Sequence, residues 1–435
     1  MLAYLKKINN GAASFIPIQL GDAMSSGGEG TVYSILGNDS WKEYFIPTKT
    51  VVTKRVCAKI YSADHLRKHG KQLENKLNFM IRHRPEHLHD GPANMIQICY
   101  PFGVLYDKPN GRFVGMLMYL GLDDSVSMSI IANDKAEAYY KRLHQMGKLN
   151  KTEWDIYKKF QFSPNGQPLA ARYIIVHNVA SLVQYLHSTG KYVVADMKPD
   201  NMLITIKGGI SLVDVDSIQV SFGREKYPSL VSTFDYAPPE FHKKISAQKK
   251  FKDVYFDLFS IAVIFYKILT GTHPFCYSVK SGDINVGTSV PEHIKNGGFA
   301  CGKNRNNYQL LPQHKRFDNL PSAIQDLFKR AFEGPPKTRP IALEWKNTMA
   351  AIIKGGPKTS SNNYRPIAKK TAPKTAPKTA PKNAPKIAPK IAPKIAPNNI
   401  QHKNFRWKNY CPFCGTRYSN PASSNFCSRC SKKRE

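Results

Sequence analysis

A four-residue repeat near the C-terminal end divides this chain of 435 residues into parts that can and cannot fold. Between residues 371 and 398 a proline stands at every fourth position, mostly in units of Ala-Pro-Lys preceded by Thr or Ile. Proline lacks the backbone N–H that helices and inner strands require, so this stretch excludes both. We therefore predict that residues 354–405 form a disordered Lys/Ala/Pro-rich linker, extended in the polyproline manner.

The positive charge of the chain is concentrated in its tail. The whole chain has 64 Lys+Arg against 31 Asp+Glu, a net charge of +33, and residues 354–435 contribute 19 basic residues and one acid, a net +18. A basic tail indicates an anionic partner, such as nucleic acid, an acidic protein or a membrane surface. For the linker, two interpretations stay open: a solvated tether, or an arm that contacts nucleic acid nonspecifically by releasing counterions.

The last thirty residues, 406–435, carry two Cys-x-x-Cys pairs that are separated by twelve residues. The four cysteines are Cys411, Cys414, Cys427 and Cys430. Four thiolates in such pairs suit a tetrahedral, structural Zn²⁺ with no open coordination position, so we predict a small zinc ribbon; two disulfides or free thiols are the alternative. The ribbon mixes aromatic and basic residues, which suits either nucleic acid or docking on a protein.

The first 353 residues have the pattern of a folded domain. Hydrophobic residues make up 41% of the whole chain and charged residues 22%, as in ordinary globular proteins. The most apolar run, residues 256–269, is too short to span a bilayer and contains two charges, so it predicts a buried helix. No signal peptide is recognised, and four scattered cysteines besides the quartet favour a reducing compartment; we expect a cytoplasmic protein without a membrane span.

A series of short motifs follows in a fixed order along this domain. Each motif is weak alone, because a glycine-rich turn or a lysine within a strand is common, but the order and spacing are specific. The series comprises the glycine-rich residues 25–33, the strand Cys57-Ala58-Lys59, the loop Asp196-Met197-Lys198-Pro199-Asp200-Asn201, the segment Val213-Asp214-Val215-Asp216, the run Tyr236-Ala237-Pro238-Pro239-Glu240, Asp257 at the head of the apolar run, and Arg339-Pro340.

In this order the motifs resemble those of the eukaryotic-type Ser/Thr protein kinases, over residues 20–350. The resemblance implies an α+β, bilobal fold over residues 14–353, with an N-lobe to about residue 120 and a C-lobe over 121–353. It implies transfer of phosphate from ATP, with Mg²⁺ or Mn²⁺, to serine or threonine of a protein substrate. Two alternatives stay open: a nucleotide-binding pseudokinase scaffold, and a regulator whose main function is nucleic-acid binding by the tail.

The resemblance also implies roles for individual residues. Lys59 would hold the α- and β-phosphates of ATP, and Glu74 would pair with Lys59 from a helix predicted around Leu73, Leu77 and Met80. The residues implied to contact the nucleotide are Gly27, Gly28, Gly30, Val32, Ala58, Lys59, Glu74, Met118, Leu120, Asp124 and Leu203.

In the catalytic loop, Asp196 would orient the substrate hydroxyl and accept its proton, and Lys198 would steady the transferred phosphate. Asn201 and Asp214 would hold magnesium, because phosphoryl transfer needs metal and cationic groups around the spreading negative charge. Glu240 and Arg339 would form a buried structural ion pair.

The chain departs from the family's pattern at three places. Ser25 stands where the first glycine is usual, Val194-Ala195 replaces His-Arg before the catalytic aspartate, and Val215-Asp216 replaces Phe-Gly after the metal-binding aspartate. The extra carboxylate of Asp216 would favour a second cation or weaken conformational switching, and the sequence leaves both open. A narrower resemblance, to bacterial kinases with a C-terminal zinc ribbon, implies a cognate phosphatase and a von Willebrand A-type protein as partners.

Overall fold

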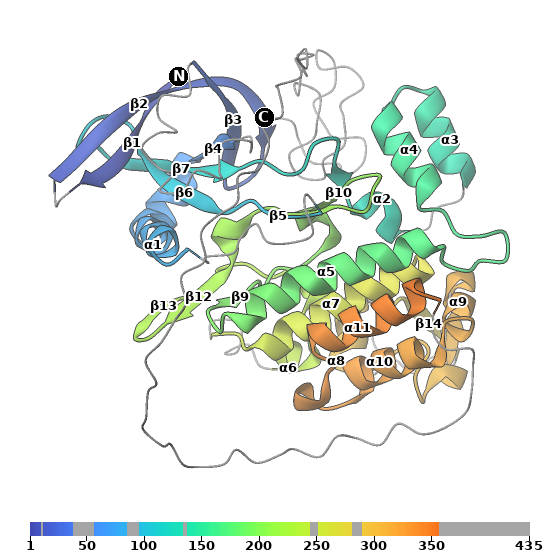
Figure 1. Cartoon of the computed structure of the whole chain (residues 1–435). Coiled ribbons are helices and arrows are strands. Elements are labelled where there is room, and N and C mark those ends of the chain that lie inside the picture. The colour runs from blue at the N-terminus through green and yellow to red at the C-terminus, as the bar shows by residue number, and fades with distance from the viewer. Residues whose placement is uncertain are drawn as a thin grey trace, which may run out of the picture. The chain divides into compact units, whose positions relative to one another are not determined.

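The computed structural model describes residues 1–9, 12–37, 56–84, 95–133, 137–243, 251–280 and 289–355. The predicted zinc ribbon lies outside the described residues, as does the predicted linker apart from its first two residues. Within the described part, a β-rich N-terminal region is followed by a mainly helical region (Figure 1).

Six strands of the N-terminal region form a closed barrel in the order β1-β2-β3-β4-β7-β6. Their bounds are β1 (Leu2–Asn9), β2 (Ala12–Ser26), β3 (Gly30–Leu36), β4 (Val56–Tyr61), β6 (Pro101–Tyr106) and β7 (Phe113–Tyr119). The predicted domain start at residue 14 falls within β2, and the structure moves it to Leu2: β1 pairs antiparallel with both β2 and β6 and so closes the barrel. Its alternate residues Ala3 and Leu5 are buried in the barrel core, as the two-residue period of a strand requires.

Helix α1 (Ala63–Arg82) packs against β6 and β7. Its N-terminus is capped by Ser62, whose side chain accepts a hydrogen bond from the N–H of His65. Leu73, Leu77 and Met80 are buried at helical spacing, which confirms the predicted helix. The same buried face carries a charged residue, Lys76.

Two small sheets lie between the barrel and the helices (Figure 1). One has the order β5-β11-β10-β8 and the other β13-β12-β9. Their bounds are β5 (Ile96–Ile98), β8 (Val126–Ser127), β9 (Tyr192–Val193), β10 (Met202–Ile204), β11 (Ile210–Leu212), β12 (Gln219–Phe222) and β13 (Glu225–Tyr227). Short strands therefore alternate with turns over residues 192–222, and these turns carry Asp196, Asn201 and Asp214.

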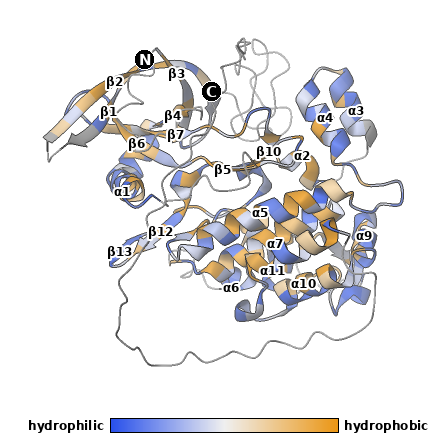
Figure 2. Cartoon of the chain, in the orientation of Figure 1, coloured by the Kyte–Doolittle hydropathy of each residue, from blue (hydrophilic) through white to orange (hydrophobic). Residues whose placement is uncertain are grey.

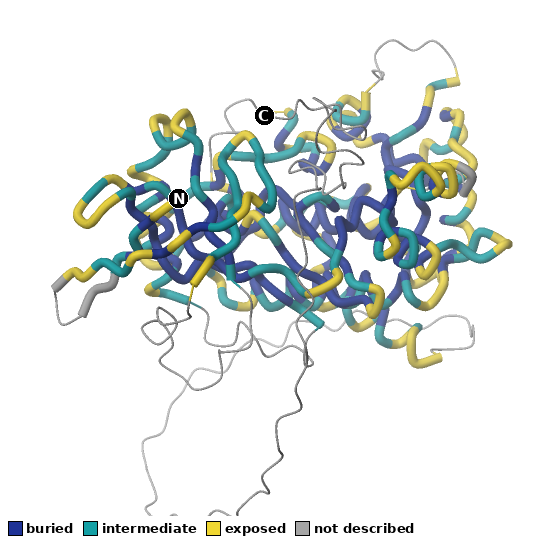
Figure 3. Tube along the Cα trace, turned by 90° about the horizontal axis from the view of Figure 1, so that it is seen from above, coloured by how far each residue is buried: buried dark blue, intermediate teal, exposed yellow. Residues whose placement is uncertain are grey.

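The helical region is built around α7 (Val254–Thr270), which contacts α5 (Ala170–Ser188) and α10 (Ser322–Glu333). Every α7 residue from Phe256 onward is buried, so the prediction of a buried helix is confirmed. Apolar residues concentrate on α5 and α7 (Figure 2). Buried residues lie in the middle of the molecule, and the tips of the loops are exposed (Figure 3). The other elements are α2 (Ser129–Ala132), α3 (Glu137–Gln145), α4 (Lys151–Lys159), α6 (Pro239–Lys243), α8 (Val290–Lys295), α9 (Lys315–Asp318), α11 (Ala342–Ile353), β14 (Tyr277–Val279) and β15 (Tyr308–Leu310).

The long connection between barrel and helical core contains a pair of short helices, α3 and α4, that pack against each other. Aromatic contacts join them: the rings of Tyr140 and Tyr157 lie 4.1 Å apart, and those of His144 and Trp154 stack at 4.7 Å. Among the described residues, no helix is both long and apolar enough to cross a membrane.

Candidate active site

The loop after β9 is fixed by a buried carboxylate of the core helix. Asp257 of α7 is fully buried and accepts hydrogen bonds from the backbone N–H groups of Val194 at 2.7 Å and Ala195 at 2.8 Å. Ala195 has a φ of 64°, a left-handed conformation that is costly for a residue with a Cβ. The two bonds to one carboxylate hold this conformation, and Asp196 follows directly. Asp257 belongs to the ordered series of motifs in the sequence, but its anchoring role was not predicted.

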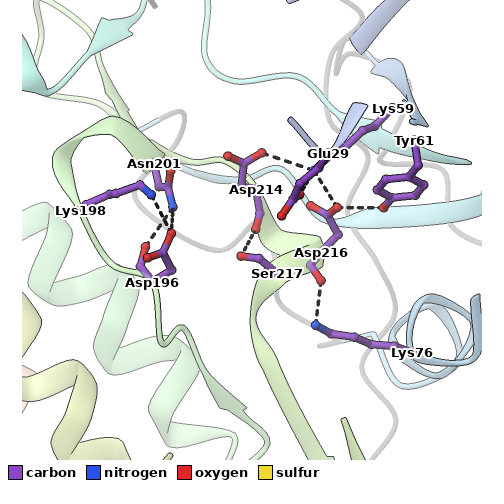
Figure 4. A network of polar contacts seen from close by, with 10 residues as sticks. All are labelled: Glu29, Lys59, Tyr61, Lys76, Asp196, Lys198, Asn201, Asp214, Asp216 and Ser217. Atoms are coloured by element: carbon purple, nitrogen blue, oxygen red, sulfur yellow. Dashed lines mark hydrogen bonds and ion pairs between the residues drawn. The ribbon is translucent and has the colours of Figure 1, made fainter. Parts of the chain in front are cut away.

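Asp196 is buried at the centre of a polar cluster. Its carboxylate accepts from Lys198 Nζ at 2.8 Å and from Asn201 Nδ2 at 3.1 Å on one oxygen, and from the Thr233 hydroxyl at 2.7 Å on the other. Thr233 also lies 3.1 Å from Lys198 Nζ. The structure therefore brings together the three residues predicted for catalysis, Asp196, Lys198 and Asn201, in one hydrogen-bonded cluster. Figure 4 shows Lys198 and Asn201 converging on Asp196.

Asp214 presents its side chain beside this cluster. It precedes the short 3₁₀ helix η3 (Val215–Ser217) with a left-handed φ of 55°, and its backbone carbonyl accepts from Ser217 Oγ at 2.7 Å. Its side chain remains 52% exposed. In Figure 4 Asp214 lies between the Asp196 cluster and the Lys59 cluster. An exposed carboxylate with the Asn201 amide nearby suits Mg²⁺, which takes few protein oxygens and fills its shell with phosphates and water.

The described residues contain no group of three or more His, Cys, Asp or Glu side chains that would form a metal site alone. A metal held by Asn201 and Asp214 would therefore depend on ligands from a bound nucleotide and from water.

Lys59 lies buried on β4 among three carboxylates. Its Nζ is 2.7 Å from Asp216 Oδ2, 3.1 Å from Glu29 Oε2 and 3.6 Å from Asp214 Oδ1. Burial works to lower the pKa of Lys59, but the negative charges of Asp216 first, then Asp214 and Glu29, outweigh it and raise that pKa above its usual value. Lys59 is therefore held as a cation in the interior.

The predicted pairing of Lys59 with Glu74 is wrong in this structure. Glu74 accepts a hydrogen bond from the hydroxyl of Tyr106 on β6 instead. The cause is the rotation of α1: its apolar face buries Leu73 and Leu77, and this directs Lys76, between them, inward to Asp216. A residue two positions earlier points about 200° away on a helix. The signals that could have shown this were a lysine within the apolar face and a carboxylate where the family has glycine.

The glycine-rich segment forms a tight turn between β2 and β3. Gly27 N–H donates to Gly30 O at 2.8 Å. A Cβ on Gly30 would lie 2.2 Å from Ile60 O on β4, so only glycine allows the strands to approach here. Gly27 and Gly28 have open space around their Cα atoms, which leaves their backbone accessible. From this turn the Glu29 side chain reaches Lys59 (Figure 4).

The residues predicted to surround the adenine lie on neighbouring strands. Val32 on β3 is opposite Lys59, and Ala58 on β4 is buried opposite Leu117 of β7. Met118 is near the end of β7, and its carbonyl accepts a weak bond from Cys57 Sγ at 3.8 Å. The remaining predicted positions follow the barrel: Leu120 directly after β7, Asp124 in an exposed turn with a φ of 53°, and Leu203 on β10. The structure thus places these side chains, and their nucleotide contacts remain predictions.

The predicted ion pair between Glu240 and Arg339 is confirmed. The two guanidinium nitrogens of Arg339 donate to the two oxygens of Glu240 at 2.6 and 2.8 Å, and one also donates to Tyr255 O at 3.0 Å. Arg339 is buried, whereas the Glu240 side chain is 44% exposed, so only the cationic half of the pair is fully removed from water.

Comparison with known proteins finds one family that is similar to part of this chain. Residues 145–349 match the model of the protein kinase domain. The chain is 32% identical over 108 residues to developmentally-regulated protein kinase 1 of Dictyostelium discoideum, an alignment that covers 25% of this chain and 14% of that protein. It is 26% identical over 167 residues to a probable serine/threonine-protein kinase of Clostridium perfringens (37% of this chain, 20% of that protein). It is 29% identical over 151 residues to Aurora kinase of Patiria pectinifera (33% and 35%).

The chain thus spans between 14% and 35% of the length of these relatives. The matched segment includes Asp196, Asn201 and Asp214, and the barrel with Lys59 precedes it. The barrel, the helical region and the catalytic cluster between them together have the α+β architecture of a protein kinase. Over residues 145–349 the chain is therefore similar to the protein kinase domain, and the relatives named above are serine/threonine protein kinases or kinases of related name.

Proposed function

We propose that this chain is an ATP-dependent protein kinase that phosphorylates serine or threonine side chains. The observation that carries the proposal is the cluster around Asp196, with Lys198, Asn201 and Thr233 all within 3.1 Å of its carboxylate or of each other. Phosphoryl transfer depends on positioning and on neutralising charge, and this cluster supplies an acceptor for a proton beside a cation for the phosphate.

In the proposed reaction each residue has a separate task. Asp196 orients a substrate hydroxyl and accepts its proton. That hydroxyl takes the place of the Thr233 hydroxyl, which lies 2.7 Å from the Asp196 carboxylate. Lys198 neutralises the transferred phosphate. Asn201 and Asp214 would hold magnesium, which supplies charge neutralisation on the phosphate oxygens when bound. Lys59 binds the α- and β-phosphates. The free hydroxyl oxygen forms the new P–O bond as the bond from the γ-phosphorus to ADP breaks.

A second candidate, a nucleotide-binding scaffold without transfer, is favoured by one observation. Glu29 forms an ion pair with Lys59, the residue that nucleotide phosphates would reach. If this ion pair persists when ATP binds, the phosphates stay away from Lys59 and out of register with Asp196.

The test uses the full chain with γ-labelled ATP, Mg²⁺ or Mn²⁺, and a generic basic protein as acceptor. Wild type should transfer label to serine or threonine, while Asp196→Ala and Asp214→Ala should reduce transfer by at least about a hundredfold. Asp326→Ala, an exposed aspartate on α10, is the matched control and should behave as wild type. Nucleotide binding without transfer in the wild type would favour the scaffold instead.

We further propose that the tail recruits the kinase to its partners. Support comes from the cysteine spacing and the net charge of +18 over residues 354–435. Cys411, Cys414, Cys427 and Cys430 would bind one structural Zn²⁺. The partner would be an anionic surface, nucleic acid included, or a protein such as a cognate phosphatase or a von Willebrand A-type protein. Elemental analysis of the full chain should give one zinc per chain, and none after Cys411→Ser with Cys427→Ser.

A further inference from the structure

Asp216 is the residue that joins the active-site lysine to helix α1. It is 3% exposed, and its Oδ2 accepts from Lys59 Nζ at 2.7 Å and from the Tyr61 hydroxyl at 2.8 Å. Its backbone carbonyl accepts from Lys76 Nζ of α1 at 2.7 Å. One residue of the segment after Asp214 therefore contacts both the strand that carries Lys59 and the helix beside it (Figure 4).

The three carboxylates around Lys59 differ in how far they are removed from water. The side chain of Asp216 is 3% exposed, that of Glu29 35% and that of Asp214 52%. A buried charge pair is costly to break because the remaining charge has no solvent, whereas exposed pairs contribute little. Glu29 and Asp214 can therefore exchange Lys59 for water or another ligand, while Asp216 stays paired with Lys59.

This difference assigns separate roles to the carboxylates when a nucleotide arrives. The phosphates compete with Glu29 for Lys59, since both are anions and Glu29 extends from the glycine-rich turn. Asp214 is needed for a metal. Asp216 keeps its two side-chain bonds throughout, so the direction of the Lys59 side chain is set by Asp216 alone.

We propose that Asp216 positions Lys59 for ATP, in place of a carboxylate from α1, and that Lys76 couples α1 to this pair. The proposal rests on the proposed kinase function. It accounts together for three features: Glu74 is bonded to Tyr106, a lysine is buried on the inner face of α1, and a buried aspartate stands two residues after Asp214.

The charges are thus the reverse of those that the family resemblance implies: helix α1 contributes the cation, Lys76, and the loop contributes the anion, Asp216. A neutral residue at position 216 would leave Lys59 with only exposed partners. It would also leave Lys59 and Lys76 as two buried cations on either side of position 216. Position 216 is therefore predicted to be far less tolerant than Glu29.

The test compares variants of the full chain with the wild type in phosphate transfer and in ATP titration. Asp216→Asn keeps the size and removes the charge; we expect the KM and Kd for ATP to rise on the order of tenfold to a hundredfold, as for loss of one charged hydrogen bond. The KM for the protein acceptor should not change. A rise in the KM for ATP alone distinguishes this effect from a general loss of folding, which would only lower the amount of active enzyme. Glu29→Gln should leave ATP affinity equal or tighter. Asp326→Asn on α10 is the neutral control.

The fourth variant moves the carboxylate to the helix. Lys76→Glu combined with Asp216→Gly restores a carboxylate on the inner face of α1, and we expect it to recover ATP affinity relative to Asp216→Gly alone. This keeps the test valid if Asp216→Asn folds poorly, because rescue is measured between two variants that both lack Asp216.

The outcomes separate this inference from the proposed function. Equal ATP affinity in Asp216→Asn and wild type, or a larger loss in Glu74→Gln than in Asp216→Asn, would overturn the positioning role while the kinase function stands. Absence of transfer in the wild type would overturn the kinase function, and the ATP titration would still decide the role of Asp216.

Discussion

Replacing Asp257 by asparagine should destabilise the domain and displace the catalytic loop. The carboxylate has no exposure to solvent and accepts three hydrogen bonds, from Val194 N and Ala195 N at 2.7 and 2.8 Å and from His187 Nε2 at 2.9 Å. An asparagine amide offers one acceptor oxygen and one NH₂ group, so whichever way it turns, at least one buried N–H faces another donor.

The magnitude follows from these bonds. A hydrogen bond to a charged group contributes about 1.5–3 kcal/mol, and a buried donor without an acceptor costs about 1–3 kcal/mol. Losing one to two such bonds should therefore lower the free energy of unfolding by about 2–5 kcal/mol. At about 2–4 °C per kcal/mol for a large domain, the melting temperature should fall by roughly 5–15 °C.

The assay is thermal and urea unfolding of wild type, Asp257→Asn and Asp253→Asn. Asp253 begins the same helix, is exposed and makes no side-chain cap bond, so its substitution is the matched control and should change the free energy of unfolding by less than about 0.5 kcal/mol. Phosphate transfer by Asp257→Asn should also fall at temperatures where it is folded, because Ala195 and Asp196 lose their anchor. A loss of stability below about 1 kcal/mol, or equal to that of Asp253→Asn, would refute this reasoning.

Three further predictions concern the interior. Arg339→Met should lower the free energy of unfolding by about 3 kcal/mol, measured by urea denaturation, because it breaks a bidentate pair whose arginine is buried. Burial lowers the pKa of His273 well below its usual value, so only the unfolded chain takes up a proton at this side chain as the pH falls below about 6.5. Between pH 7.5 and pH 5.5 the free energy of unfolding of the wild type should therefore fall by about 1.4 kcal/mol more than that of His273→Gln. Burial raises the pKa of Cys57 to about 12, so peptide mapping after iodoacetamide at pH 8 should show Cys276, which is half-buried, labelled well before Cys57. Equal loss of stability in wild type and His273→Gln, or equal labelling of the two thiols, would contradict the last two.

The parts of the site that lie close together in sequence could be predicted from it. Asp196, Lys198 and Asn201 belong to one loop of six residues, and the structure shows them in one cluster. The helix over residues 256–269 was evident because its residues are apolar on every face, and the Glu240–Arg339 pair followed from the family resemblance.

The parts that depend on packing between distant segments could not be predicted. The partner of Lys59 is decided by how α1 rotates on the barrel, and a spacing along the chain does not fix that rotation. Strand β1 has no motif, and besides its pairing with β2 it closes the barrel by pairing with β6, about a hundred residues later. The anchoring role of Asp257 likewise depends on a loop more than sixty residues earlier in the chain.

The most direct test of the central claim is the single-turnover rate of phosphate transfer from bound ATP in wild type and Asp196→Asn. Both proteins are first saturated with ATP and Mg²⁺, and transfer to an acceptor serine or threonine is then followed by mass spectrometry of the phosphorylated peptide. We expect a rate lower by about 10²- to 10⁴-fold in Asp196→Asn, with unchanged ATP affinity, because this carboxylate serves the hydroxyl rather than the nucleotide. Equal rates in the two proteins, or no transfer in either, would contradict it.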